Sequence, residues 1–163
     1  MSVLVLGIGN ILLKDEGIGV HAIQEFEKRY QIPDDVTVVD GGTAGMELIQ
    51  YIAGKDTLII VDALKTGADV GTLIRLSGDE VPQFFRTKIS PHQLGLSDML
   101  AAMKLTDETP ETVVLIGVIP KDLGTGLDLS DEIAGKIDPL VQMVVTELQG
   151  LGVELSPSET AGD

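Results

Sequence analysis

The chain has 163 residues, of which 44% are hydrophobic, and this length and composition suit one domain with one core. Its 26 acidic and 11 basic residues give a net charge of −15, which argues against nucleic acids or anionic membranes as partners, because both would be repelled. The sequence contains no cysteine, so disulfides, thiolate metal sites and thiol nucleophiles are excluded. Any metal ligands must therefore be oxygen and imidazole groups.

The first predicted strand, Val3 to Ile8, leads into a glycine-rich segment that begins like a phosphate-binding loop. A dinucleotide fingerprint has the pattern G-x-G-x-x-G after a strand, and here Leu12 stands at the third glycine. Asp15 and Glu16 follow, and two carboxylates would repel a bound pyrophosphate. The segment therefore favours a cation over a nucleotide.

Along the rest of the chain, short apolar runs alternate with longer amphipathic ones, which predicts an α/β domain with a mainly parallel, buried sheet. We expect the domain to span residues 1–155, and residues 156–163, which carry no large apolar side chain, to form a flexible tail. Pro139 should kink or restart the last helix. The further predicted strands are Val36 to Asp40, Thr57 to Asp62, Gly71 to Leu76 and Thr112 to Ile119, and the predicted helices cover 18–30, 46–53, a segment from Ser90, and 130–150.

Ser90, Pro91 and Gln93 carry three helix-start signals together. Ser90 suits the N-cap, Pro91 the first helical position, and Gln93 the third, where it would complete a capping box with Ser90. His92 is thereby predicted to lie in the first turn. A helix N-terminus disfavours a protonated imidazole, so we expect the ring to be neutral and able to donate a lone pair to a metal ion.

Acidic residues follow the first three predicted strands. In open α/β sheets, ligands bind outside the carboxyl ends of the strands, where the strand order reverses. Asp15 and Glu16 come after the first strand, Asp40 closes the second and Asp62 closes the third. If the first and third strands are neighbours, Glu16 and Asp62 face each other across the crevice, and His92 is the natural third member of the site. Two carboxylates and one imidazole suit zinc, nickel or iron better than calcium.

Each of these residues also has a purely structural interpretation. Asp62 suits a turn cap, Glu16 a favourable charge at a helix start, and His92 a capped, partly exposed helix position. The segment Asp40–Thr43 is also compatible with a simple turn whose last residue is the N-cap of the next helix. His21 lies beside a helical stripe, and we expect it to have no functional role.

Five segments of the chain form a specific ordered set. They are 7–19 (GIGNILLKDEGIG), 40–48 (DGGTAGMEL), 59–63 (IIVDA), 89–96 (ISPHQLGL) and 117–120 (GVIP). The set resembles the maturation endopeptidases of nickel–iron hydrogenases, in particular the branch that processes the large subunit of uptake hydrogenases. The resemblance runs from residue 1 to about residue 150.

The resemblance implies a three-layer α/β/α sandwich around a five-stranded, mostly parallel, twisted sheet with one antiparallel strand, for which Gly71 to Leu76 or its neighbour is the candidate. It also implies that Glu16, Asp62 and His92 bind nickel and carry the catalysis. The nickel would belong to the hydrogenase large-subunit precursor, whose C-terminal peptide the enzyme removes after nickel insertion. Whether the resting enzyme holds metal or is metal-free stays open. We further expect a monomeric, cytoplasmic hydrolase.

Two mechanisms remain open at this point. In the metal-assisted one, nickel polarises the scissile carbonyl or activates water while Glu16 or Asp62 moves the proton. In the other, of aspartyl type, nickel serves only in recognition and Asp40 is the base. Asp40 and the turn Gly41-Gly42-Thr43 are then the substrate-binding residues, because glycines let the substrate backbone come close.

Two other functions also remain open. A nucleotide-binding regulatory module is suggested by the strand–glycine–helix opening of the chain. A nickel metallochaperone without proteolytic activity would use the same three ligands, and it would bind nickel stoichiometrically by itself.

Overall fold

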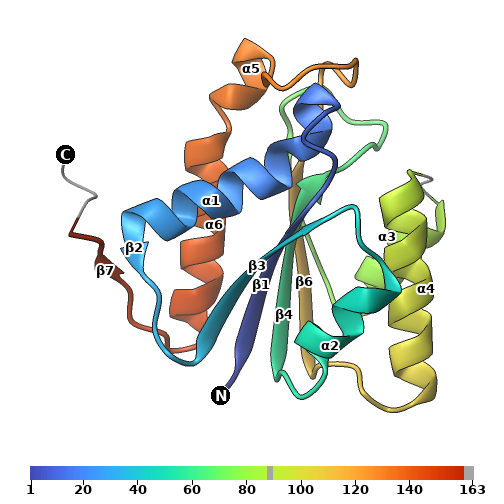
Figure 1. Cartoon of the computed structure of the whole chain (residues 1–163), viewed down its shortest axis with the longest axis vertical. Coiled ribbons are helices and arrows are strands. Elements are labelled where there is room, and N and C mark those ends of the chain that lie inside the picture. The colour runs from blue at the N-terminus through green and yellow to red at the C-terminus, as the bar shows by residue number, and fades with distance from the viewer. Residues whose placement is uncertain (88–89, 160–163) are drawn as a thin grey trace.

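The computed structural model describes residues 1–87 and 90–159 and is built on a five-stranded sheet (Figure 1). Its strands are β1 (Val3–Ile8), β3 (Val36–Gly42), β4 (Thr57–Ala63), β5 (Leu73–Ser77) and β6 (Thr112–Val118). They lie in the order β3-β1-β4-β6-β5, where β5 is antiparallel to β6 and all other pairs are parallel. The predicted adjacency of the first and third strands, and the antiparallel strand near residues 71–76, are both confirmed.

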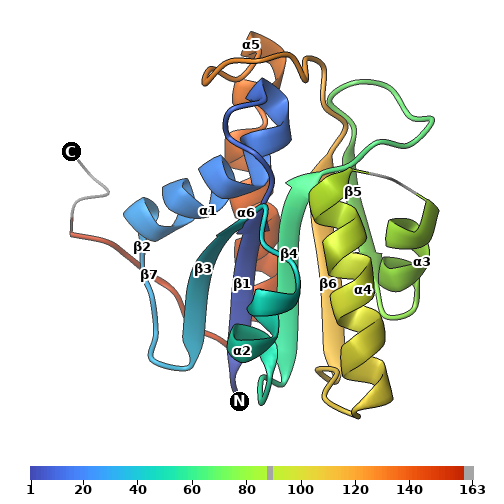
Figure 2. The same ribbon diagram turned by 45° about the vertical axis from the view of Figure 1, so that its right-hand side comes forward.

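Helices cover both faces of the sheet, which confirms the predicted three-layer α/β/α architecture (Figures 1 and 2). On one face lie α1 (Ile18–Arg29) and α6 (Ile137–Gly150), and on the other lie α2 (Ile49–Ile52), α3 (Glu80–Thr87) and α4 (Pro91–Leu105). The short helix α5 (Asp131–Ala134) and the single-turn 3-10 helices η1 (Lys14–Gly17) and η2 (Met46–Leu48) complete the set, with η2 forming the first part of the predicted helix 46–53.

The direction of each strand side chain follows from its position along the strand. Successive residues of a strand point to opposite faces. In β4, Ile59 and Val61 belong to the core under α1 and α6, whereas Leu58 and Ile60 belong to the core under α3 and α4. Asp62 has the same parity as Leu58 and Ile60, so the sheet geometry turns its carboxylate toward α4.

The predicted helix over 130–150 is divided into α5 and α6. Ser130 is the N-cap of α5, as predicted, and α6 begins at Ile137, so that Pro139 lies in its first turn. A proline is tolerated there because the first N–H groups of a helix have no partner inside it. The predicted restart of the helix near Pro139 is confirmed, and the break falls just before it.

The segment predicted as a flexible tail is paired at its beginning. The short strand β7 (Ser156–Pro157) runs antiparallel to β2 (Tyr30–Gln31), and the N–H of Ser158 donates to the carbonyl of Arg29 at 2.8 Å. Backbone hydrogen bonds thus hold residues 156–158 in the structure, and the flexibility of the tail stays a prediction. Residues 160–163 lie outside the described residues.

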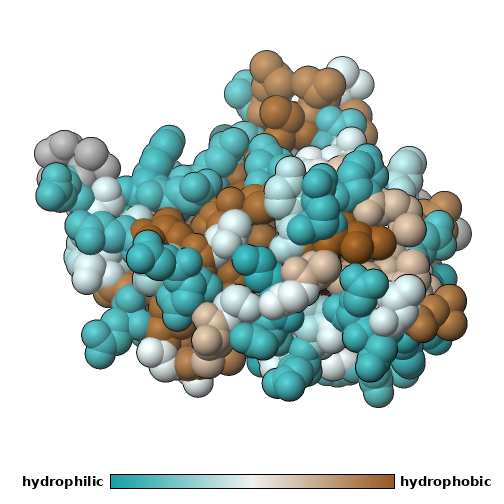
Figure 3. Space-filling view, turned by 60° about the horizontal axis from the view of Figure 1, so that its bottom comes forward, coloured by the Kyte–Doolittle hydropathy of each residue, from teal (hydrophilic) through white to brown (hydrophobic). Residues whose placement is uncertain are grey.

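The surface is of mixed polarity. Figure 3 brings forward the amino-terminal edge of the sheet, at the bottom of Figure 1, where hydrophilic residues cover much of the face and hydrophobic ones lie between them. Some of the most exposed large apolar side chains, Ile11, Leu12 and Leu127, instead belong to loops beyond the carboxyl ends of the strands. Within residues 1–87 and 90–159, no helix has the length and apolar character needed to cross a membrane.

Candidate active site

The loop between β1 and α1 is folded against a later loop of the chain. The backbone N–H groups of residues 12–16 all donate within the chain, to Asn10 and to carbonyl oxygens of this loop and of residues 122–126. Gly9 has a φ of +125°, and a Cβ there would lie 1.9 Å from the carbonyl oxygen of Glu16. Because a pyrophosphate needs free N–H groups at this position, the loop gives no support to the nucleotide-binding alternative.

The prediction of a cation site at Asp15 and Glu16 is wrong for Asp15. Its buried carboxylate accepts hydrogen bonds from the N–H groups of Lys121 (2.9 Å), Asp122 (2.8 Å) and Ser130 (2.8 Å), and from the Ser130 hydroxyl (2.7 Å). Burial alone would raise the pKa of Asp15, but these hydrogen bonds outweigh it and lower the pKa below its ordinary value. Both oxygens are occupied, so Asp15 is unavailable to a cation.

The structure brings Glu16, Asp62 and His92 together beyond the carboxyl ends of β1 and β4. Nδ1 of His92 lies 3.0 Å from Oε1 of Glu16, and Nε2 lies 3.1 Å from Oδ2 of Asp62. The imidazole thus bridges two carboxylates, one at each nitrogen. The Asp62 side chain is completely buried, while that of Glu16 is 15% exposed, so this line of groups opens to solvent at Glu16.

The proton affinity of His92 differs from the expectation of a neutral ring. Burial by itself would lower the pKa of His92, but hydrogen bonding and attraction from Asp62, followed by Glu16, outweigh it and raise the pKa above its ordinary value. Burial also raises the pKa of Asp62, against the opposing effects of His92 and Gln93. The helix N-terminus does not set the charge of the ring, because two carboxylates lie closer to it.

Gln93 contributes to the site in a way that the sequence did not indicate. Its side-chain amide donates to Oδ2 of Asp62 at 2.9 Å and to the carbonyl of Ala63 at 3.1 Å. Ser90 is the N-cap, as predicted, and accepts the Gln93 N–H at 3.3 Å, but the Gln93 side chain holds Asp62 instead of completing the capping box. The helix-start pattern predicted a capping role for Gln93. The only indication in the sequence of a role in the site was its position next to His92.

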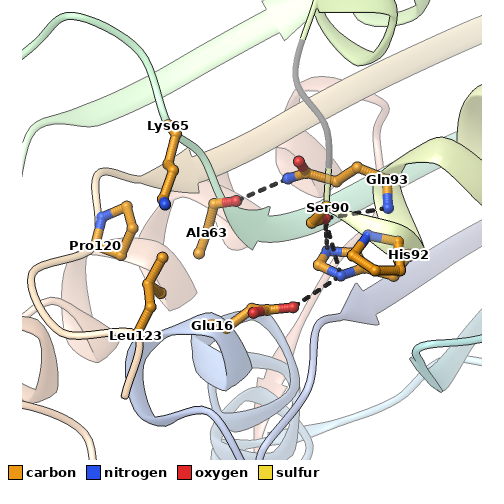
Figure 4. Close-up of a pocket in the computed structure, with 9 residues that line it drawn as sticks. Glu16, Ala63, Lys65, Ser90, His92, Gln93, Pro120 and Leu123 are labelled. Atoms are coloured by element: carbon orange, nitrogen blue, oxygen red, sulfur yellow. Dashed lines mark hydrogen bonds and ion pairs between the residues drawn. The ribbon is translucent and has the colours of Figure 1, made fainter.

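A pocket of about 230 Å³ lies beside Glu16 and His92 (Figure 4). Lys65 extends into it from the loop after β4, and Pro120 and Leu123 line the side opposite His92. Among residues 1–87 and 90–159, Lys65 has no hydrogen-bond or ion-pair partner. Pro120 belongs to one of the five segments of the resemblance, whereas Lys65 and Leu123 carried no signal in the sequence, because the sheet topology alone brings their loops to the site.

The turn that begins at Asp40 lines a separate pocket of about 310 Å³, together with residues 9–12 and Val20. Oδ1 of Asp40 accepts the N–H of Gly42 at 2.9 Å, and Gly42 has a φ of +51°. A Cβ on Gly42 would meet no other atom within 4 Å. Asp40 and Gly42 thus border open space, although they do not line the pocket beside His92.

The other two residues of this turn, Gly41 and Thr43, have different surroundings from each other. Gly41 forms an irregularity in the pairing of β1 with β3, and a Cβ there would lie 2.8 Å from Cδ1 of Leu6. Thr43 is exposed and lines the same pocket as Asp40. The alternative interpretation of Thr43 as the N-cap of the next helix is wrong, because Gly45 occupies that position.

The three candidate ligands form a line of contacts through the imidazole ring of His92. In the part of the chain that the structure describes, no group of three or more His, Asp or Glu side chains is arranged to hold a metal ion. The reason is that Glu16 and Asp62 contact different nitrogens of the ring. Imidazole and carboxylate groups are nonetheless suitable ligands for nickel, so their sharing of one ion stays a prediction.

The chain is similar in sequence to proteins of hydrogenase maturation. A model of the hydrogenase maturation protease family matches residues 20–147. The hydrogenase 2 maturation protease of Escherichia coli K12 is 46% identical over 164 residues, which cover 100% of both chains. The hydrogenase expression/formation protein HupD of Bradyrhizobium diazoefficiens is 42% identical over 156 residues, covering 94% of this chain and 81% of HupD.

Solved structures agree with the sequence comparison. The hydrogenase maturating endopeptidase HybD from E. coli superposes with a TM-score of 0.94 at 47% identity, covering 96% of this chain and 98% of HybD. A hydrogenase maturation protease from Thermococcus kodakarensis superposes with a TM-score of 0.74 at 27% identity, covering 90% and 99%. The chain therefore belongs to the hydrogenase maturation protease family.

Proposed function

We propose that this protein is a cytoplasmic, monomeric endopeptidase that removes a C-terminal peptide from the nickel-loaded large-subunit precursor of a nickel–iron hydrogenase. Membership of the hydrogenase maturation protease family supports the peptidase activity. The observation that supports the proposed active site is the line of Glu16, His92 and Asp62, which opens at Glu16 onto a pocket.

Asp62 and Glu16 have different roles in this proposal. Asp62 accepts hydrogen bonds from Gln93 and from the Ala63 N–H, and it contacts Nε2 of His92, so it holds the ring in one orientation. Glu16 lines the pocket, is partly exposed, and contacts His92 through one oxygen. A carboxylate that reaches both solvent and substrate is the better general base, so Glu16 takes this role.

Nickel enters the proposal as part of the substrate. The protein offers two carboxylates and one imidazole, each already paired with another, and it has no cysteine. Nickel binding requires a deprotonated ring nitrogen, and the two carboxylates raise the pKa of His92, so the ion must compete with a proton more than it would at a free imidazole. A precursor that presents its own bound nickel would add ligands that the protease lacks, and these additional ligands would offset the competition with the proton.

Hydrolysis then follows ordinary amide chemistry. The oxygen of water bonds to the scissile carbonyl carbon while its proton passes to Glu16. Glu16 then delivers this proton to the amide nitrogen, the C–N bond breaks, and a carboxyl group and an amine are released. The precursor's nickel polarises the carbonyl or the water. Asp40 and the turn Gly41-Gly42-Thr43 would bind the substrate backbone away from the reacting bond. As the base, Asp40 is disfavoured, because it lines a different pocket from His92.

The experiment that tests the proposal incubates the protein with nickel-loaded and with nickel-free precursor and weighs the products by mass spectrometry. We expect loss of the C-terminal peptide from the nickel-loaded precursor and none from the nickel-free form, with the His92→Ala variant inactive on both. Cleavage of both forms at equal rates would contradict the proposal. Tight, stoichiometric nickel binding by the protein without any cleavage would favour a metallochaperone.

A further inference from the structure

Asp15 connects two loops that both border the site. It directly precedes Glu16 in η1, and its carboxylate holds the backbone N–H groups of Lys121 and Asp122. Those residues immediately follow Pro120, which lines the pocket beside His92. One buried carboxylate therefore lies between the chain that carries Glu16 and the chain that forms the opposite wall of the pocket.

The behaviour of Ser130 shows that this contact takes precedence over local helix structure. Ser130 is the N-cap residue of α5, a position where the serine side chain usually accepts an N–H of the helix. Here its side chain makes no such bond, and its hydroxyl instead donates to Asp15 at 2.7 Å, beside the Ser130 N–H at 2.8 Å. Hydrogen bonds to an ionised carboxylate are stronger than neutral ones, which explains the preference.

The two loops are also joined by backbone hydrogen bonds and by one exposed ion pair. The N–H of Asp15 itself donates to the carbonyl of Asp122 at 3.0 Å. The N–H of Gly126 donates to the carbonyl of Leu12 at 2.8 Å, and the N–H of Lys14 donates back to the carbonyl of Gly126 at 3.0 Å. The Lys14 ammonium pairs with Asp122 at 3.0 Å, and both side chains are a third or more exposed. An exposed ion pair contributes little to stability, so Lys14 offers a matched control at the position next to Asp15.

We propose that Asp15 is a positioning residue of this endopeptidase, which fixes residues 120–130 against η1 so that Glu16 faces Nδ1 of His92. The proposal rests on the proposed function. Among the described residues, the Glu16 side chain has one polar contact, to His92, so its placement depends on the backbone of η1. Small displacements of a catalytic group are costly, about 100-fold in rate for a shift of about 1 Å.

The test compares Asp15→Asn with Glu16→Gln and with the control Lys14→Met. Asn keeps the size of the side chain but turns an N–H₂ group toward donors that need an acceptor. We expect kcat on nickel-loaded precursor to fall about 10- to 100-fold in Asp15→Asn, more than KM rises, and to stay unchanged in Lys14→Met. Because the chain has two histidines, the imidazole ¹⁵N resonances of His92 are readily assigned. Its Nδ1 shift at fixed pH should move in Asp15→Asn in the same direction as in Glu16→Gln.

Wild-type kcat and an unmoved Nδ1 shift in Asp15→Asn would overturn the inference, even if the amides of Lys121, Asp122 and Ser130 exchanged faster with solvent. If Asp15→Asn does not fold, Ser130→Ala carries the same test, since it removes one donor to Asp15 and no helix cap. A severalfold loss of kcat is then expected, and no loss would overturn the inference. Full activity of Glu16→Gln would overturn the proposed role of the site itself, which separates the two failures.

Discussion

The two carboxylates that contact His92 lie in different surroundings. Asp62 is the last residue but one of the central strand β4, is completely buried, and is held by Gln93 and by the N–H of Ala63. Glu16 lies in a single 3-10 turn and faces a pocket. The difference suggests a division of work in which one side of the imidazole fixes the ring and the other side meets the substrate.

The largest effect is expected from removing the Asp62 carboxylate, which fixes the orientation of the His92 ring. Asp62→Ala should abolish processing, about 1,000-fold or more, because His92 loses the group that orients it and favours its charge. It should also lower the free energy of unfolding by about 1–3 kcal/mol, since the buried Nε2 of His92 loses its contact with Asp62 and the Gln93 amide keeps only the Ala63 carbonyl as acceptor. Urea denaturation and single-turnover cleavage measure the two effects, and wild-type stability would show that the Asp62 contacts do not hold the site.

His92→Ala should also be inactive. It should in addition lower the free energy of unfolding, more than a substitution in the first turn of a helix usually does. The residue is 3% exposed and contacts the buried Asp62, so we expect a loss of about 1–2 kcal/mol in the free energy of unfolding. His92→Gln, which keeps a polar side chain near Asp62, is the matched control for stability. An alanine variant that cleaves at the wild-type rate would contradict the role of the imidazole.

Removing the Glu16 carboxylate should lower activity with little change in stability. Glu16→Gln should lower kcat about 100-fold or more, because the amide cannot accept the proton of water. The free energy of unfolding should change by less than about 1 kcal/mol, since the side chain is partly exposed and has one polar contact among the described residues. If Glu16→Gln instead lost as much stability as Asp62→Ala and kept its activity, Glu16 would be a structural residue and not the general base.

The turn after β3 should show an intermediate effect. Gly42→Val places a branched side chain at a φ of +51°, where space is open, so we expect a loss of about 1–2 kcal/mol from backbone strain and a fall of about tenfold or more in kcat/KM. Gly54→Val is the control for strain, because Gly54 also has a positive φ, of +81°, and open space around it, but lies outside this turn. Unchanged kcat/KM in Gly42→Val would make the turn structural only.

The smallest expected effect is a pH dependence of stability. The pKa of His92 is raised in the folded protein, so its contribution is fully present below the unfolded pKa of about 6.5 and is lost as pH rises through the folded value. Glu16→Gln removes one cause of the raised pKa, so its stability should fall less between about pH 6 and about pH 9. Identical pH profiles of the two proteins in chemical denaturation would show that Glu16 does not interact with the ring.

Local patterns in the sequence predicted the elements and most of the site. The apolar run ending at Asp62, and the helix-start signals around His92, were sufficient to bring these residues to one edge of the sheet. The opposite roles of neighbours such as Asp15 and Glu16 were not predictable, because they depend on residues 121–130, more than a hundred positions away. Gln93 was misassigned for a related reason: its local partner, Ser90, was visible in the sequence and its distant one, Asp62, was not.

The most direct test of the account concerns how nickel reaches the site. The protease is incubated with nickel, desalted, and mixed with nickel-free precursor, while a parallel sample receives nickel-loaded precursor and untreated protease. We predict cleavage in the second sample and none in the first, because the proposed function has Glu16, Asp62 and His92 hold the ion only together with the ligands of the precursor. Efficient cleavage in the first sample would contradict the account, since it would make nickel a resident metal of the protease.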